Sequence, residues 1–144
     1  MKQDFAEELN QDGFTPLHIA AAHGHIEIVK ELLKTDRYLC NHEGRERRIP
    51  LHCAAIKGKV VIKELLWASK DSIENTTVRG ETALHLAVKN HQFQAFKALV
   101  EHLKEFNKEY VLNEKDGQGN TILHLAVSRK QYEASIRPSR ITAR

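Results

Sequence analysis

Four histidine residues recur along this chain at nearly regular intervals, and histidine is the commonest protein ligand for metal ions. They are His18, His52, His85 and His124, which follow one another after 34, 33 and 39 residues. A zinc site needs four ligand atoms about 2.0 to 2.3 Å from one point. Residues one repeat apart should lie on neighbouring packed helices, about 8 to 10 Å apart. These imidazoles therefore cannot converge on one ion, and we expect each to have a structural role and no metal to bind.

The other reactive residues form no arrangement that is typical of an enzyme. No serine or cysteine lies in a nucleophile motif, and no pair of carboxylates stands out in the sequence. The run Gly117-Gln118-Gly119-Asn120 lacks the following Lys-Ser/Thr of a phosphate-binding loop. We therefore expect a non-catalytic protein with no cofactor and no small-molecule substrate.

Each histidine belongs to a short tract that predicts the start of a helix. Thr15 can accept a bond from a backbone N–H of the first turn, and Pro16 then lies where its missing N–H costs nothing. His18 is close enough to bond the capping hydroxyl with one ring nitrogen and a loop carbonyl with the other. The same threonine–histidine spacing recurs at Thr82 with His85 and at Thr121 with His124. Ile49 replaces the threonine before His52, and since a lost cap costs about 1 kcal/mol, the second tract should be locally weaker.

A break and a second, amphipathic helix are predicted after each of the first three tracts. Gly24 and Gly58 supply the left-handed conformation at the first two breaks, and His91 takes this position in the third. Beyond the breaks, apolar residues recur every three or four positions, which predicts one buried face. This face is expected to include Ile28 in the first repeat and Val60 in the second. Within the third repeat, whose second helix is expected to be extended, the segment 105–112 predicts either a longer helix with a wider loop or an insertion used for binding.

The tract Thr15-Pro16-Leu17-His18-Ile19-Ala20-Ala21 and its three copies resemble the T-P-L-H-x-A mark of ankyrin repeats. The resemblance implies an all-α ankyrin-repeat solenoid of stacked helix-turn-helix repeats with hairpin-like loops. The expected divisions are the tail of a preceding repeat at 1–11, repeats at 12–44, 45–77 and 78–116, an incomplete repeat at 117–132, and an irregular basic tail at 133–144. Unfinished repeats at both ends predict exposed apolar faces and possible self-association.

A closer resemblance rests on the third repeat. The run Thr76-Thr77-Val78-Arg79-Gly80-Glu81-Thr82-Ala83-Leu84-His85-Leu86-Ala87-Val88-Lys89-Asn90, with Ile49–Ala55 before it and Leu112–His124 after it, is similar to plant ankyrin proteins. Those proteins end in a membrane domain with a Pro-Gly-Gly signature, and some are associated with immune signalling. The resemblance implies a cytosolic signalling or defence platform. Because this sequence contains no such membrane domain and its fourth repeat is unfinished, we expect a cytoplasmic chain that is a fragment or a truncated product.

The ankyrin resemblance also implies a surface for a protein partner, whose identity the sequence does not give. This surface would consist of the loop tips and the exposed face of the first helix of each repeat. The corresponding positions are Phe14, Ala22, His23, Arg45, Arg47, Arg48, Lys57, Val78, Arg79, Glu81, Lys89, Asn90, Gln118, Asn120, Ser128 and Arg129. Phe14 and Val78 are candidate apolar anchors. The alternative for each position is an ordinary exposed loop residue, and for the whole chain a structural spacer without its own partner.

Charge gives a weaker indication of the partner. The basic residues of the second repeat, Arg45, Arg47, Arg48, Lys57 and Lys59, suggest an acidic protein or an anionic membrane surface. Glu43, Glu46 and Glu64 lie nearby and favour an ordinary solvated face. The net charge is +3, and no aromatic residues that could stack on bases are interleaved with the cluster, so we expect no nucleic-acid binding.

Overall fold

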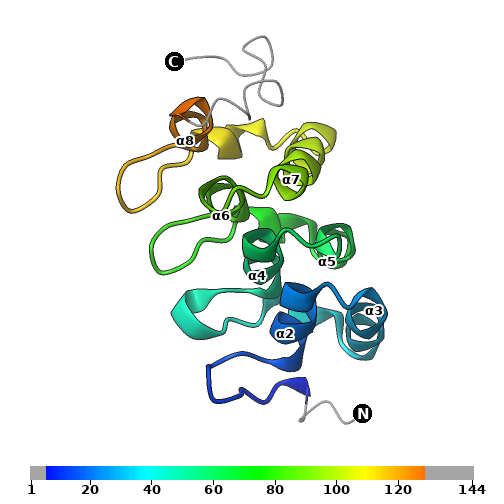
Figure 1. The fold of residues 1–144 in the computed structure, drawn as a ribbon. Coiled ribbons are helices and arrows are strands. Elements are labelled where there is room, and N and C mark those ends of the chain that lie inside the picture. Colours follow the sequence, from blue (N-terminus) through cyan, green and yellow to red (C-terminus); the bar gives the residue numbers. More distant parts are fainter. Residues whose placement is uncertain (1–5, 129–144) are drawn as a thin grey trace.

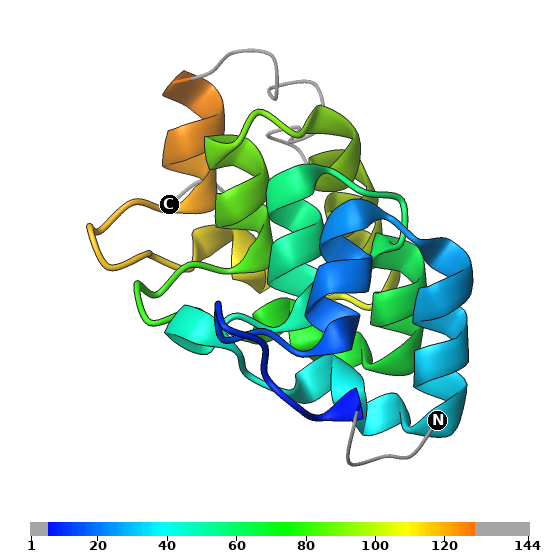
Figure 2. The ribbon, with the colours of Figure 1, turned by 60° about the horizontal axis from the view of Figure 1, so that its bottom comes forward.

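Short and longer helices alternate along the chain and form two columns in the computed structural model, which describes residues 6–128 (Figure 1). The inner column contains α2 (Pro16–His23), α4 (Pro50–Lys57), α6 (Ala83–Lys89) and α8 (Ile122–Ser128). The outer column contains α3 (Ile26–Thr35), α5 (Ile62–Ala68) and α7 (Phe93–Glu105). Loops project on the side of the inner column away from the outer helices, as Figure 2 also shows. This arrangement confirms the all-α solenoid.

Short 3-10 helices connect the columns. They are η1 (Arg37–Asn41), η2 (Arg45–Arg47), η3 (Lys70–Glu74) and η4 (Glu109–Asn113). Extended pairing among the described residues is limited to an isolated antiparallel bridge between Lys115 and Thr121. In the first three repeats a tight turn thus joins the inner helix to the outer helix that follows it. The chain then returns to the inner column through a 3-10 helix and a projecting loop.

The predicted breaks between paired helices have the expected backbone conformation. Gly24 and Gly58 end α2 and α4 with φ angles of 74° and 68°. A Cβ atom on Gly58 would also lie 2.2 Å from Oε1 of Gln92, so the next repeat packs directly against this turn. His91 has a φ of 57°, which places a side chain in the left-handed region that favours glycine.

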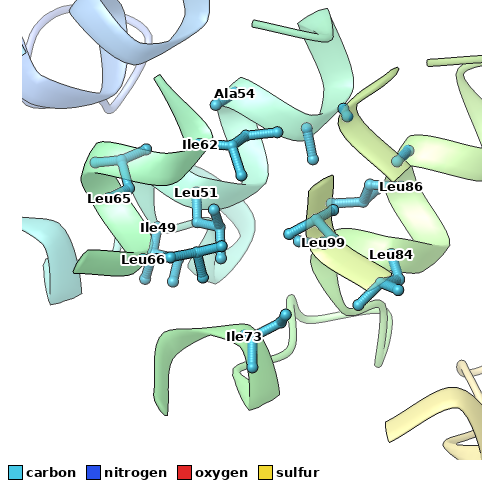
Figure 3. Packing of buried hydrophobic residues seen from close by; sticks show 14 of the residues in the cluster. Ile49, Leu51, Ala54, Ile62, Leu65, Leu66, Ile73, Leu84, Leu86 and Leu99 are labelled. Carbon is cyan, nitrogen blue, oxygen red and sulfur yellow. The ribbon is translucent and has the colours of Figure 1, made fainter. Parts of the chain in front are cut away.

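Small and branched apolar residues fill the space between the columns. Alanines of the inner helices are fully or almost fully buried, which lets successive helices approach closely: Ala20, Ala21, Ala54, Ala55, Ala87 and Ala126. Figure 3 shows Ile49 and Leu51 packed with Leu65 and Leu66 of α5. Ile73 of η3 belongs to the same cluster, so the 3-10 helices close the core at its lower edge.

Two residues expected on the buried face are exposed instead. Val60 is 74% exposed because α5 begins only at Ile62, which leaves Val60 in the shortened turn before the helix. Ile28 is 50% exposed on α3, since within the described residues no outer helix precedes α3 and covers it. The shorter second repeat therefore changes which apolar residues face the core.

The segment 105–112 of the third repeat is bonded to the second repeat. α7 continues to Glu105, and Val111 and Leu112 of η4 are buried. The ammonium of Lys108 contacts Oδ1 of Asp71 at 2.8 Å and also pairs with the carboxylate of Glu74. These hydrogen bonds raise the pKa of Lys108. α7 is therefore the longer helix expected here, and the connection after it packs against η3, while a use of this segment for binding stays a prediction.

Candidate partner-binding surface

The tips of the four loops form a continuous row through backbone hydrogen bonds. The Arg45 N–H donates to the carbonyl of Gly13 at 2.9 Å, and the Val78 N–H donates to the carbonyl of Glu46 at 2.9 Å. In the same way the Gly117 N–H donates to the carbonyl of Arg79 at 2.7 Å. Each loop is thus fixed to its neighbour, although the loops extend away from the helices (Figure 1). We call this row of tips, with the adjoining exposed ends of the inner helices, the loop face.

The second loop takes its place in this row of bonded tips through an uncommon backbone conformation. Glu46 and Arg47 have consecutive φ angles of 59° and 61°, and neither is glycine. Such residues cost roughly 1 to 2 kcal/mol each. Backbone bonds hold the turn: the Gly44 N–H donates to the Arg48 carbonyl at 2.7 Å, the Arg47 N–H donates to the Gly44 carbonyl at 3.0 Å, and the Arg48 N–H donates to the Arg45 carbonyl at 3.1 Å. The Glu46 carbonyl accepts from the next loop. The strained turn leaves the side chains of Arg45 and Arg47 exposed at the tip.

The repeated histidines attach these loops to the inner helices. Nδ1 of His18 accepts a bond from the Thr15 N–H at 3.1 Å, so Nε2 carries the proton and donates to the carbonyl of Arg48 at 2.8 Å. Equivalent bonds link Nε2 of His52 to the carbonyl of Asn75 at 3.0 Å. Nε2 of His85 lies 3.1 Å from the carbonyls of both Glu114 and Asn120. His18, His52 and His85 thus make the bonds to the helix start and to a loop carbonyl that the sequence predicts for them.

Burial keeps these imidazoles neutral. It lowers the pKa of His18 and of His85, and lowers the pKa of His52 to about 4. His124 is exposed, and its Nδ1 lies 2.7 Å from the Thr121 hydroxyl, so it makes the local bond of the motif. Ile49 has no hydroxyl, yet its N–H still donates to Nδ1 of His52 at 3.0 Å. The second tract thus keeps one of the two capping bonds, and Ile49 is itself fully buried.

An ion cluster fixes the third loop against the fourth. The ammonium of Lys89 lies 2.8 Å from Oε2 of Glu81 and 2.9 Å from Oδ2 of Asp116. Burial acts to raise the pKa of Asp116, but Lys89 and the N–H groups of Gln118 and Asn120 outweigh it and hold the pKa below its usual range. The expectation that Glu81 is an exposed contact residue was wrong, because it is 8% exposed and bonded within the cluster.

Asp116 was not recognised from the sequence as part of this cluster. Its Oδ1 accepts bonds from the N–H groups of Gln118 and Asn120, both at 2.9 Å. An Asp-Gly pair such as Asp116-Gly117 is typical of a turn, but pairing with Lys89 depends on the stacking of two repeats. Lys89 is therefore a structural residue with a partly exposed side chain, and it is not a free cation for a partner.

The other predicted contact residues have different degrees of exposure. Val78 is 61% exposed, and exposure is also high at His23, Arg45, Arg47, Lys57, Arg79, Asn90, Gln118 and Ser128. Four positions are half-buried: Phe14, Ala22, Arg48 and Asn120. The ring of Phe14 packs on His18 with 5.4 Å between centroids, which limits its use as an anchor. Arg129 and the tail at 133–144 lie outside the described residues. The binding role of all these positions stays a prediction.

The charge of the loop face is positive. Arg47 pairs with Glu43 at 3.7 Å, and Arg48 pairs with Glu46 at 3.3 Å. Within residues 6–128, no ion pair engages the guanidinium groups of Arg45 and Arg79. Arg79 adjoins the exposed Val78 in the third loop, and Arg45 lies in the second loop, whose Glu46 carbonyl accepts from the Val78 N–H. The loop face thus combines an apolar side chain with unpaired positive charge.

The chain thus repeats a pair of helices that carries a histidine and a hydrogen-bonded loop tip. Its sequence also matches a known family directly. The profile of the family described as ankyrin repeats (3 copies) matches residues 2–73 and 51–135, which together cover most of the chain. This chain belongs to the ankyrin-repeat family. Ankyrin repeats are protein–protein interaction modules, so the chain is one too.

Several proteins of known name share the repeats. NF-kappa-B inhibitor alpha of Gallus gallus is 29% identical over 101 residues, which are 68% of this chain and 32% of that protein. Ankyrin repeat-containing protein ITN1 of Arabidopsis thaliana is 36% identical over 77 residues, or 53% of this chain and 13% of that protein. B-cell lymphoma 3 protein of Homo sapiens is 32% identical over 103 residues, which are 67% of this chain and 22% of that protein. The chain thus spans about a third or less of these relatives.

No helix within residues 6–128 combines the length and the apolar character that crossing a bilayer requires.

Proposed function

We propose that this chain is a non-catalytic module that binds a protein partner through its loop face. One observation carries the proposal: backbone bonds fix the four loop tips in a row, and this row exposes Arg45 in the second loop and Val78 and Arg79 in the third. A preorganised surface loses little conformational entropy on binding, which favours affinity. An exposed apolar residue with cations on its own loop and on the neighbouring loop fits a partner segment that carries both apolar and acidic residues.

The finer assignment follows the resemblance to plant ankyrin proteins. We propose a signalling or defence-related plant protein, and the likeness to ITN1 of Arabidopsis thaliana supports this source. A cytoplasmic location belongs to the same proposal, because Cys40 and Cys53 are both free and buried, which suits a reducing compartment. A structural spacer without its own partner is the alternative function.

Affinity capture from a plant cell extract would test the loop face. The bait would be the chain itself, beside a variant with Arg45→Glu and Arg79→Glu and a control variant with Lys30→Glu and Lys34→Glu on α3. Circular dichroism would first establish that all three are equally helical. We expect proteins that are enriched by the chain and the control, and depleted at least tenfold by the loop-face variant. Equal capture by all three, or none, would support the spacer.

A further inference from the structure

A groove runs between the outer helices α5 and α7, in the column opposite the loop face (Figure 1). It consists of two hollows of about 370 and 270 Å³. Both hollows are lined by Lys63, Ala98 and Glu101, so they form one continuous channel along the helix pair. The groove uses none of the residues assigned to the loop face.

The groove has a strongly exposed apolar residue at each end. Val60 lines the first hollow and is 74% exposed, while Trp67 lines the second and is 77% exposed. The small side chain of Ala98 lines both hollows between these ends. Tryptophan is enriched among residues that dominate binding energy, so an indole that is mostly exposed beside a hollow is a candidate anchor.

Positive charge surrounds these apolar residues. Four lysines line the hollows, Lys59, Lys63, Lys70 and Lys97, against the glutamates Glu101 and Glu105. The ammonium of Lys70 lies 4.9 Å from the ring centre of Phe106 and 5.9 Å from that of Trp67. Cation–π attraction therefore holds a charge at the aromatic end of the groove. The lining thus combines apolar anchors with a net positive border.

We propose that this groove binds an amphipathic helix of a partner protein, with an apolar stripe facing Val60 and Trp67 and acidic residues facing the lysines. A channel between two packed helices with anchors at both ends suits the helix-in-groove mode, in which apolar residues on one face enter the channel. Complementary charge then fixes the orientation of the bound helix and speeds its association with the groove. An anionic lipid surface fits less well, because a planar bilayer surface cannot enter a channel between two helices, whereas a single helix can.

The test uses three synthetic 18-residue peptides. The first carries leucines along one helical face and glutamates elsewhere, the second replaces each glutamate by lysine, and the third scrambles the first so that the face is lost. Trp67 is the only tryptophan of the chain, so its emission reports on the groove directly. We expect a saturable blue shift with the first peptide, and at least tenfold weaker binding of the other two.

Variants assign the binding to the groove. Anisotropy of the labelled acidic peptide should show at least tenfold weaker binding to Trp67→Ala and to the pair Lys63→Glu and Lys97→Glu. The loop-face pair Arg45→Glu and Arg79→Glu should bind as the chain does, with circular dichroism confirming equal helicity. Equal affinity for the acidic and basic peptides, or loss of binding only in the loop-face pair, would overturn the proposal. So would a shift produced by phosphatidylserine vesicles and by none of the peptides.

Discussion

The Nε2 atom of His52 lies 3.0 Å from the carbonyl oxygen of Asn75, a residue 23 positions further along the chain. Nδ1 of the same ring accepts a bond from the Ile49 N–H at 3.0 Å. Both nitrogens are thus used by a neutral imidazole that is fully buried. Protonation of Nδ1 would place a second donor against the Ile49 N–H, and it would bury a charge. The bond that secures the start of the third loop therefore requires the neutral ring.

Acidification should destabilise the fold through this histidine. Burial lowers the pKa of His52 from 6.5 to about 4, so the unfolded state binds the proton first. The stabilisation is complete above pH 6.5 and declines as the pH falls from 6.5 towards 4. Between pH 7.5 and 5.0 the free energy of unfolding in urea should fall by at least about 2 kcal/mol. His52→Gln should reduce this fall, and the exposed His124→Gln should not; an unchanged fall in His52→Gln would contradict the assignment.

The hydroxyl of the capping threonine in the third repeat should stabilise the fold beyond what the packing of the side chain contributes. The Thr82 hydroxyl accepts from the His85 N–H at 3.4 Å and lies 3.0 Å from Nδ1 of His85. Thr82→Val keeps the shape and removes the hydroxyl, so it should lower the free energy of unfolding by about 1 kcal/mol. Thr82→Ser keeps the hydroxyl and should be the more stable of the two variants in urea denaturation. The reverse order would show that packing of the methyl group outweighs the cap.

Removal of the cation between the third and fourth loops should leave two carboxylates without a counterion. Glu81 and Asp116 are 8% and 6% exposed, and both pair with Lys89. Lys89→Met should cost about 2 kcal/mol, less than a fully buried pair because the lysine side chain is partly exposed. Lys97→Met on the exposed face of α7 is the control and should change little. Equal urea midpoints for the two variants would mean that solvent screens the cluster completely.

Glycine at the third break should stabilise the fold. His91 has a φ of 57°, and a left-handed conformation costs about 1 to 2 kcal/mol for most residues with a side chain. Glycine loses more conformational entropy on folding, which offsets about 0.5 to 1 kcal/mol of this gain. His91→Gly should therefore raise the free energy of unfolding by about 0.5 to 1 kcal/mol. Asn107 has a φ of 55°, and asparagine tolerates this region, so Asn107→Gly should gain less. Thermal unfolding of both variants measures the difference; a lower midpoint for His91→Gly would refute the strain argument.

Local features of the fold could be predicted because neighbouring residues produce them. The Thr15–His18 cap and the left-handed glycines Gly24 and Gly58 depend on contacts within one turn, and the structure has them as expected. The loop-closing bonds of the histidines could also be anticipated, since each ring has one nitrogen left over after capping. The carbonyl that each would meet was not predictable, because it belongs to the next loop.

The sequence by itself determined the repeat, its period and the start and break of each helix, because these depend on cap chemistry and on periodicity within a few residues. The tertiary structure decided which side chains of neighbouring repeats meet. It buried Glu81 against Lys89 and Asp116, exposed Val60 in a shortened turn, and placed Trp67 beside the α7 helix to form a groove. Such contacts depend on how one repeat stacks on the next, and a small difference in turn length changes that stacking while the local pattern stays the same.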